Sequence, residues 1–208
     1  MSNEFGYIGT AKPTQAVLSN SGVFSVNEHK ELIEDKKILS FGQLELIETK
    51  SISGTPSTFS FDTLKESTYD VHFVTITDYK PQTDDRHLMV RMKVGGTTDT
   101  GSNYRYAMQR INTGSSVVQS ANDSKIWLAY NIGLNREGLN GSFYLYNAGD
   151  STKFTFLTSC NVHFGIGIDY NYQSGVHDSA KSVNGLEFSA SAGNVEHGTF
   201  SLYGIRYS

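Results

Sequence analysis

The sequence predicts an all-β protein: a jelly-roll-like antiparallel β-sandwich preceded by an extended N-terminal arm and one short helix. Apolar and polar residues alternate with period 2 over about ten to twelve short segments, as strands with one buried face do. Turn-forming residues separate these segments. The chain has 20 Gly, 12% aromatic and 18% charged residues. Only one segment has a helical pattern, which excludes the alternating helices of a parallel sheet.

The overall composition limits the classes of function. The 208 residues are enough for one large domain, and the formal net charge of -4 argues against nucleic-acid binding, which needs a concentrated basic surface. Cys160 is the single cysteine, so no intrachain disulfide is expected. The first residues lack the basic and apolar regions of a signal peptide. No run reaches the ~18 apolar residues of a membrane span. We therefore expect a soluble protein without membrane insertion.

Residues 1–40 are predicted to form an N-terminal anchoring arm that ends in the short helix. Residues 1–27 carry large apolar side chains, but glycines and Pro13 interrupt any period. Such a segment cannot bury its side chains alone, so we expect it to become ordered on another surface, in its own chain or in a partner. A flexible leader is the alternative. The expected contact residues are Phe5, Tyr7, Ile8, Val17, Leu18, Val23 and Phe24.

The predicted helix covers Asn27 to Ile38. Asn27 suits the N-cap, and the charges run from glutamates near the start to two lysines near the end, which complements the helix dipole. Only Leu32, Ile33 and Ile38 could face a core. We therefore expect a short surface helix that joins the arm to the body.

Residues 41–208 are predicted to form the β-sandwich domain. Turn signals, such as those at residues 112–114, separate the expected strands. No repeat of ~20–50 residues occurs, which excludes a propeller or a solenoid. The expected strands cover residues 41–48, 58–62, 69–79, 87–94, 104–111, 125–130, 141–146, 153–157 and 161–170.

The final stretch, residues 183–207, is predicted to form a closing hairpin around which the rest of the fold is organised. Leu186 and Phe188 alternate with polar residues before the turn, and Phe200 and Leu202 do so after it. Gly193 and the asparagine after it suit a hairpin turn. We therefore expect the two strands to pair with each other.

The sequence contains no catalytic or metal-binding motif. The histidines have none of the spacings of metal sites, so no metal and no cofactor is predicted. Nucleophile-elbow, P-loop and dinucleotide-binding motifs are absent as well. Cys160 lies among apolar residues and is interpreted as a small core residue. We expect that the protein is not an enzyme. A pair of carboxylates for sugar hydrolysis stays open, because its members need not be neighbours in sequence. The histidines are His29, His72, His87, His163, His177 and His197.

Two polar stretches are candidates for surface contacts. Asp84 and Asp85 could bind calcium through oxygen ligands, but without a spaced acidic ladder a turn is the preferred interpretation. Residues 170–175 (YNYQSG) are predicted to be a polar loop. Tyrosine offers contact area together with a hydroxyl group, so Tyr170 and Tyr172 are candidates for ligand or oligomer contacts.

Three stretches carry a resemblance to a known class of proteins. The N-terminal motifs FGYIG and GVFSVNE resemble the N-terminus shared by many structural proteins of tailed marine phages and cyanophages. The central run is similar to the body of those proteins, and the ending is similar to their last two strands. The motifs lie at residues 5–9, 22–28, 67–73 (STYDVHF), 81–84 (PQTD), 88–91 (LMVR), 193–195 (GNV) and 198–205 (GTFSLYGI).

The resemblance implies a β-sandwich that is made in the host cytoplasm and displayed on a phage particle. Together with the predicted layout of arm, helix and sandwich, it favours a capsid decoration or cement protein. Its implied partners are the major capsid protein or another virion component, and further copies of itself, with a trimer favoured. Location on the head, neck or tail stays open. One alternative is a tail- or fibre-associated module that binds a host receptor or surface glycan. Another is a polysaccharide hydrolase, which needs two carboxylates ~5–10 Å apart in a groove.

Overall fold

The computed structural model describes residues 27, 30–31, 44–112, 114–133, 138–164 and 167–205. The chain divides into two units, residues 1–43 with Ser208 and residues 44–207, and the second unit is described below. Asn27, Lys30 and Glu31 have helical backbone. The rest of the predicted helix and all of the predicted arm contacts, from Phe5 to Phe24, lie outside the described residues.

The described residues form thirteen strands and confirm the all-β prediction. Each strand carries the β-branched and aromatic residues that suit a pleated, half-buried surface. The strands are β1 (Leu44–Ser51), β2 (Thr58–Phe61), β3 (Val71–Pro81), β4 (Arg86–Val94), β5 (Thr97–Thr98), β6 (Tyr104–Ile111), β7 (Ser115–Asp123), β8 (Ile126–Ile132), β9 (Leu139–Tyr146), β10 (Thr155–Phe164), β11 (Ile168–His177), β12 (Val183–Ala190) and β13 (Val195–Ile205).

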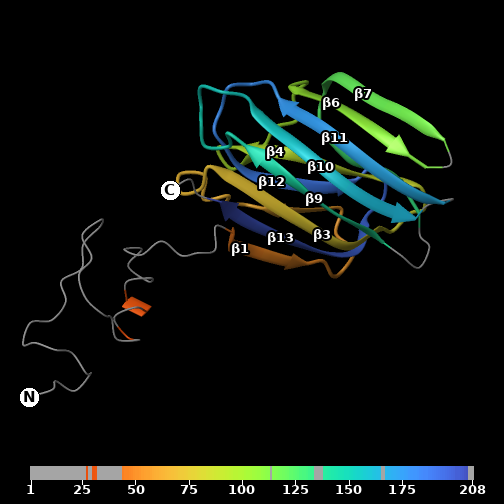
Figure 1. Cartoon of the computed structure of the whole chain (residues 1–208), viewed down its shortest axis with the longest axis horizontal. Coiled ribbons are helices and arrows are strands. Elements are labelled where there is room, and N and C mark those ends of the chain that lie inside the picture. Colours follow the sequence, from red (N-terminus) through yellow and green to blue (C-terminus); the bar gives the residue numbers. More distant parts are fainter. Residues whose placement is uncertain are drawn as a thin grey trace, which may run out of the picture. The chain divides into compact units, whose positions relative to one another are not determined.

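These strands make two antiparallel sheets. The first has eight strands in the order β1-β13-β3-β9-β10-β11-β6-β7. The second has the order β2-β12-β4-β5, and β8 pairs with β4. Figure 1 shows the eight-stranded sheet in front, with β4 and β12 of the second sheet behind it. The chain passes repeatedly between the sheets, so most neighbouring strands are distant in sequence.

One hydrophobic core contains residues from both sheets. Phe188 of β12 is fully buried at its centre. The centroid of its ring lies 5.1 Å from that of Phe59, 6.0 Å from Phe61, 6.1 Å from Phe143 and 5.0 Å from Phe200. Aromatic pairs at these separations stabilise a core beyond the burial of their area. The inward side chains of the alternating strands thus hold the two sheets together.

The predicted closing hairpin is wrong. β12 pairs with β2 and β4, whereas β13 pairs with β1 and β3 in the other sheet. The turn between them carries the chain across the core, and Gly193 has the positive φ of 73° that this turn requires. Alternation correctly predicted the burial of Leu186, Phe188, Phe200 and Leu202. It does not specify the partner of a strand, and a turn between sheets has the same Gly-Asn signal as a hairpin.

Two further predictions of strand boundaries are wrong. Residues 153–157 and 161–170 were expected as two strands, but the first strand runs unbroken through Phe164 as β10, and β11 begins at Ile168. β7 was not predicted. These strands are rich in Ser, Asn, Gln and Thr, which weakens the apolar signal used to find strands. The missed strands lie at one end of the eight-stranded sheet.

Candidate functional site

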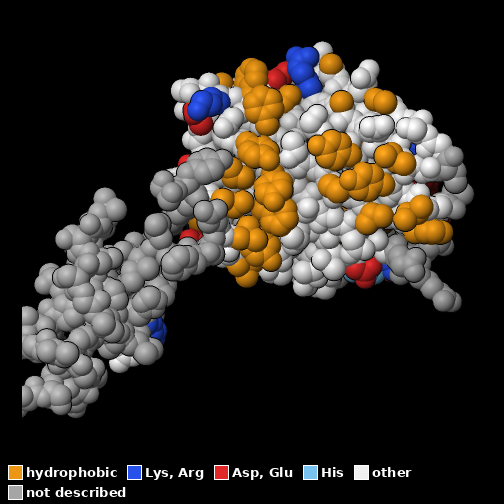
Figure 2. Space-filling model, in the orientation of Figure 1, with side chains coloured by type: hydrophobic (Ala, Val, Ile, Leu, Met, Phe, Trp, Pro, Cys, Tyr) orange, Lys and Arg blue, Asp and Glu red, His pale blue; other side chains and the backbone are white. Residues whose placement is uncertain are grey.

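Exposed large hydrophobic side chains of the described residues gather on the outer face of the eight-stranded sheet. All but one lie at outward positions of its strands, and Phe154 directly precedes β10. Figure 2 looks onto this face and shows the hydrophobic side chains across it, with charged side chains near its rim. The residues are Leu44, Leu46, Ile111, Val117, Tyr144, Phe154, Phe156, Val162, Phe164, Ile168, Tyr170 and Tyr172.

Strands at the β1 end carry the first group of these side chains, here called the edge patch. Strand register places Leu46 opposite Tyr203, Tyr203 opposite Phe73, and Phe73 opposite Tyr144. The ring centroid of Phe73 lies 4.6 Å from that of Tyr144 and 6.2 Å from that of Tyr203. Such cross-strand aromatic pairs stabilise a sheet and form a continuous surface. The edge patch consists of Leu44, Leu46, Phe73, Tyr144, Tyr146, Phe156 and Tyr203.

Strands at the β7 end carry the second group, here called the extension patch. Register places Cys160 opposite Tyr172 and Val162 opposite Tyr170. Tyr170 in turn lies opposite Ile111. The Sγ of Cys160 lies 3.0 Å from the Oη of Tyr170. The extension patch consists of Ile111, Val117, Cys160, Val162, Phe164, Ile168, Tyr170 and Tyr172.

A stripe of small hydroxyl residues separates the two patches. Thr158 lies opposite Tyr144 on one side and opposite Ser174 on the other, and Ser142 lies beside Cys160. We call Ser142, Thr158 and Ser174 the hydroxyl stripe. It gives the face a polar line between two apolar areas.

Charge distinguishes the two sheets. Among the outward residues of β6, β7, β9, β10 and β11, only Arg105 is charged, and it is paired with Asp178. The second sheet carries two ion pairs on its strands: the Nη1 of Arg91 lies 3.5 Å from a Glu187 oxygen, and Lys93 pairs with Asp62. The second sheet thus has charged side chains on its outer surface, whereas the outward positions of these five strands of the first sheet are almost free of charge.

The structure separates the predicted contact residues. Tyr170 and Tyr172 lie in β11, so the predicted loop at residues 170–175 is wrong, although both side chains are exposed. Asp84 and Asp85 lie in the turn between β3 and β4, as expected. β9 and β10 separate β3 from β11, so the aspartate pair and the tyrosine pair belong to different surfaces. Cys160 is exposed and is not the predicted core residue.

These corrections share one cause, which is that β10 and β11 turn polar residues inward. Asn161, Asn171 and Gln173 are buried. Asn161 Nδ2 donates a hydrogen bond to the Leu128 carbonyl oxygen at 2.8 Å, which ties β10 to β8 of the other sheet. Polar residues take the inward positions of these two strands, and apolar residues take the outward positions. The usual interpretation of period-2 alternation, in which apolar residues face the core, is therefore reversed here.

Buried histidines extend this polar layer. Burial lowers the pKa of His163, His87 and His72, which favours the neutral imidazole in each case. The His87 ring stacks on that of Tyr130 with centroids 4.0 Å apart, and Nε2 of His72 donates to the Leu64 carbonyl oxygen at 2.8 Å. These histidines stabilise the fold in their neutral form.

We expect the free energy of unfolding to fall as the pH drops below about 6.5, the ordinary pKa of histidine. The unfolded chain takes up protons on these histidines at a higher pH than the folded chain does. Their contribution is therefore present above that pH and is lost below it, by up to ~1.4 kcal/mol per pH unit for each group. Urea unfolding at pH 7.5 and 5.5 measures this. His163→Gln should reduce the difference. Equal free energies of unfolding at both pH values would contradict a stabilising role of the neutral histidines.

An open cleft of about 520 Å³ borders the edge patch. It is lined by the tyrosines Tyr69 and Tyr146, by carboxylates that include Glu66 and Asp150, and by Lys153. Hydrogen bonds from the Thr152 side chain and backbone, and from Lys153, lower the pKa of Asp150 to about 2. A carboxyl group that stays ionised cannot serve as the general acid of a glycosidase. The aromatic and charged groups of the cleft are suited to binding.

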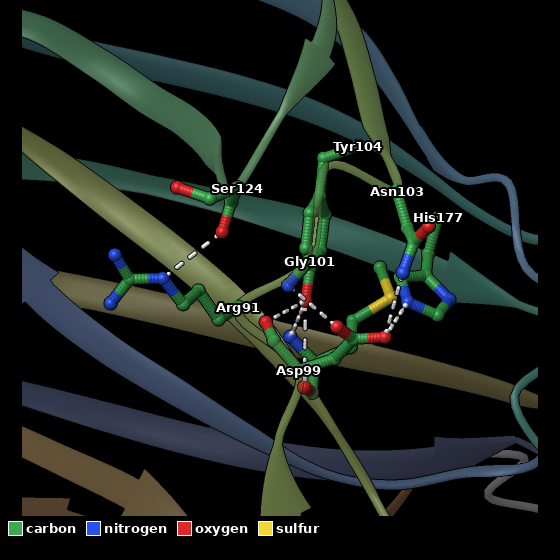
Figure 3. Close-up of polar contacts among 8 residues, drawn as sticks. Arg91, Asp99, Gly101, Asn103, Tyr104, Ser124 and His177 are labelled. Carbon is green, nitrogen blue, oxygen red and sulfur yellow. Dashed lines mark hydrogen bonds and ion pairs between the residues drawn. The ribbon is translucent and has the colours of Figure 1, made fainter.

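Asp99 joins a second polar cluster, at the end of the core. Figure 3 shows Gly101, Asn103, Tyr104 and His177 converging on this residue. The Gly101 amide donates to Oδ1 at 2.8 Å, the Asn103 amide and His177 Nε2 donate to Oδ2 at 3.1 and 3.0 Å, and the Tyr104 hydroxyl donates to the backbone oxygen at 2.8 Å. Burial opposes ionisation of Asp99, but these hydrogen bonds outweigh it and lower the pKa.

An Asp–His pair is also part of catalytic triads. Here the His177 side chain is fully buried, so a substrate cannot reach the ring. The cluster instead fixes the loop between β5 and β6 against β4 and β11. Sequence analysis missed it because Asp99 and His177 are 78 residues apart. No local spacing signals such a contact.

Neither a metal centre nor a membrane-spanning helix is found in the part of the chain that the structure describes. Groups of three or more His, Cys, Asp or Glu side chains that could hold a metal do not occur there. The same part has no helix with the length and apolar character needed to cross a bilayer. No protein family, curated protein or solved structure matches the chain.

Proposed function

We propose that the protein is a structural protein of a phage particle, a capsid decoration protein whose jelly-roll-like body is held in an assembly. The observation that carries the proposal is the outer face of the eight-stranded sheet, which combines two apolar patches with a single outward charged side chain in its five strands from β9 to β7. Large contiguous apolar areas on soluble proteins mark sites that a partner covers. Depletion of charge and enrichment in aromatic residues are typical of the buried centre of such interfaces.

The order of the strands supports a jelly roll. β1, β13, β3 and β9 are neighbours in one sheet, and β2, β12, β4 and β8 are neighbours in the other. The first strands of the body thus pair with its last strands in both sheets, as when a long hairpin is rolled into two layers. This architecture occurs in viral capsid proteins and in lectins. That likeness is an analogy of fold and agrees with the resemblance in sequence to virion proteins.

Four strands outside this rolled pattern build half of the face. β10, β11, β6 and β7 extend the first sheet beyond β9 and carry the extension patch. A sheet extended only for stability would have charged or polar side chains on its solvent side, as the second sheet does. The extension instead presents tyrosine, phenylalanine, isoleucine and valine. The added strands therefore serve to widen a contact surface.

In this proposal, the N-terminal arm and the body have separate roles. The apolar arm residues Phe5 to Phe24 contact the major capsid protein or another virion component, as the sequence predicts. The body is displayed on the particle and contacts further subunits through its sheet. No reaction is assigned to the protein: His177 of the Asp99 pair is fully buried, and Asp150 of the cleft, which stays ionised, cannot serve as a general acid.

Quantitative mass spectrometry of purified particles tests the proposal. The protein should be present in hundreds of copies, in a fixed ratio to the major capsid protein. About a dozen copies would instead assign it to the neck, tail or fibre. Its absence from purified particles would contradict a structural role.

The cleft beside the edge patch supports a second candidate, a module that binds glycans on a host surface. Tyrosine rings can pack against the apolar face of a sugar, and carboxylate and amide groups can hydrogen-bond its hydroxyl groups. A glycan array probed with the protein and with Tyr146→Ala tests this function. Specific signals that the substitution removes would support it, and an array without signals would exclude it for the glycans present.

A further inference from the structure

We infer that the outer face of the eight-stranded sheet is the interface of a homodimer, in which two copies pack face to face about a two-fold axis. The inference rests on the proposed role in an assembly and names the partner that covers the face. Figure 2 shows the apolar side chains that extend over this face and that a partner would cover. The size of the face, its charge and its division into two patches indicate a second copy.

The size of the face matches a stable interface. Eight strands ~4.8 Å apart are about 34 Å wide, and the nine residues from Phe156 to Phe164 are about 27 Å long. The footprint is therefore roughly 900 Å². A standard specific interface buries about 800 Å² on each partner. Face-to-face packing of two such sheets is sufficient for a stable dimer, with the side chains of both forming a layer ~10 Å thick.

Charge favours a second copy as the partner. Each chain has a formal net charge of -4, so two copies repel each other through their charged surfaces. On the central and extension strands of this face, Arg105 is the single charged residue, and Asp178 pairs with it. Two copies can therefore meet here without like-charge contacts. A basic or acidic partner would gain nothing from this face, because specificity for such partners requires complementary charges.

The division into two patches determines the arrangement. A two-fold axis that lies in the face along the hydroxyl stripe, oblique to the strands, exchanges the two sides of that stripe. The stripe is oblique because Thr158 and Ser174 lie opposite each other, whereas Ser142 lies one pair further along, opposite Cys160. The axis places the edge patch of each copy on the extension patch of its partner, and the hydroxyl stripes meet near the axis. A closed two-fold assembly uses the same surface on both subunits. All of the apolar side chains are then covered in one step.

Sedimentation equilibrium of the full chain tests the dimer. The wild type is expected to have the mass of a dimer at micromolar concentration. Tyr172→Asp places a charge at a side chain that is 58% exposed within the face, and should weaken association about 100-fold or more. Thr58→Asp, at the exposed first position of β2 in the second sheet, is the matched control and should leave the dimer intact. Circular dichroism checks that both variants are folded.

Mixing two variants tests the arrangement of the patches. Leu46→Asp alters the edge patch and Phe164→Lys alters the extension patch, at side chains that are 59% and 40% exposed. Each variant alone should associate at least about tenfold more weakly than the wild type, because every dimer contains the altered contact twice. In an equimolar mixture, the introduced carboxylate in the edge patch of one chain faces the extension patch that carries the introduced ammonium group of the other, while the second contact stays native. Association should therefore return toward the wild-type level.

Three results would overturn the inference: a wild type that stays monomeric at about 100 μM, a trimer, or a mixture that associates no better than its components. The count of copies in particles is independent of these results. A monomer that is abundant in particles would overturn the dimer and leave the proposed function standing. A dimer that is absent from particles would overturn the proposed function and leave the dimer standing.

Discussion

Replacing Asp99 with alanine is expected to lower the free energy of unfolding by about 3–5 kcal/mol, the range for removing one partner of a buried ionic or hydrogen-bonded pair. Two carboxylate oxygens of Asp99 accept three hydrogen bonds. Alanine would leave Nε2 of the fully buried His177 without this partner, and an unsatisfied buried donor costs about 1–3 kcal/mol by itself. The backbone bond from Tyr104 would remain, so the loop should loosen without losing its attachment.

Urea unfolding of the wild type and Asp99→Ala at pH 7.5 measures this effect. Asp62→Ala is the matched control, because Asp62 also accepts a short charged contact, from Lys93 at 2.6 Å, but its side chain is 69% exposed. Surface ion pairs contribute about 0–1 kcal/mol. Similar losses for the two variants would show that the Asp99 cluster does not hold the loop.

Phe188→Ala should cost a comparable amount, about 3–5 kcal/mol, because it leaves a cavity where the two sheets meet. Phe188 is fully buried, and rings from β2, β9 and β13 surround it. These neighbours belong to strands held by separate ladders of hydrogen bonds, so they cannot collapse into the space. The variant should unfold at a lower urea concentration, with an unchanged dependence on urea.

Phe156→Ala is the control for this substitution. Phe156 is 46% exposed on the outer face, so the same change should cost much less in dilute solution. If association covers this face, the loss of unfolding free energy caused by Phe156→Ala should increase with protein concentration. The loss caused by Phe188→Ala should not. A Phe188→Ala variant as stable as Phe156→Ala would contradict the assignment of the core.

Local patterns predicted a large part of the fold. Alternation in residues 87–94 predicted β4 and the burial of Leu88, Val90 and Met92, although Met89 is buried as well. The turn signal that begins at residue 112 marks the end of β6, as expected. Partners of strands were not predictable in this way. β12 and β13 have the sequence of a hairpin, yet they lie in different sheets. The pairing of a strand depends on segments that are distant in the chain, and alternation contains no information about them.

The apolar face was missed for a different reason. Cys160 was assigned to the core because it lies among apolar residues. Period 2 also places it on one side of a strand with Phe154, Phe156, Val162 and Phe164, and on the opposite side from Asn161 and His163. That parity was the available signal. It was read with the assumption that polar residues face solvent, whereas β10 and β11 bury them and leave the apolar side exposed.

Cys160 provides the most direct test of the central claim, that the outer face is covered in the assembled protein. It is the single cysteine of the chain, is exposed, and lies opposite Ser142 of the hydroxyl stripe, next to the proposed axis. We predict that the rate of its alkylation by iodoacetamide falls at least about tenfold as the concentration of the wild-type protein rises through the range of dimer formation. A rate that does not change with protein concentration would contradict the account.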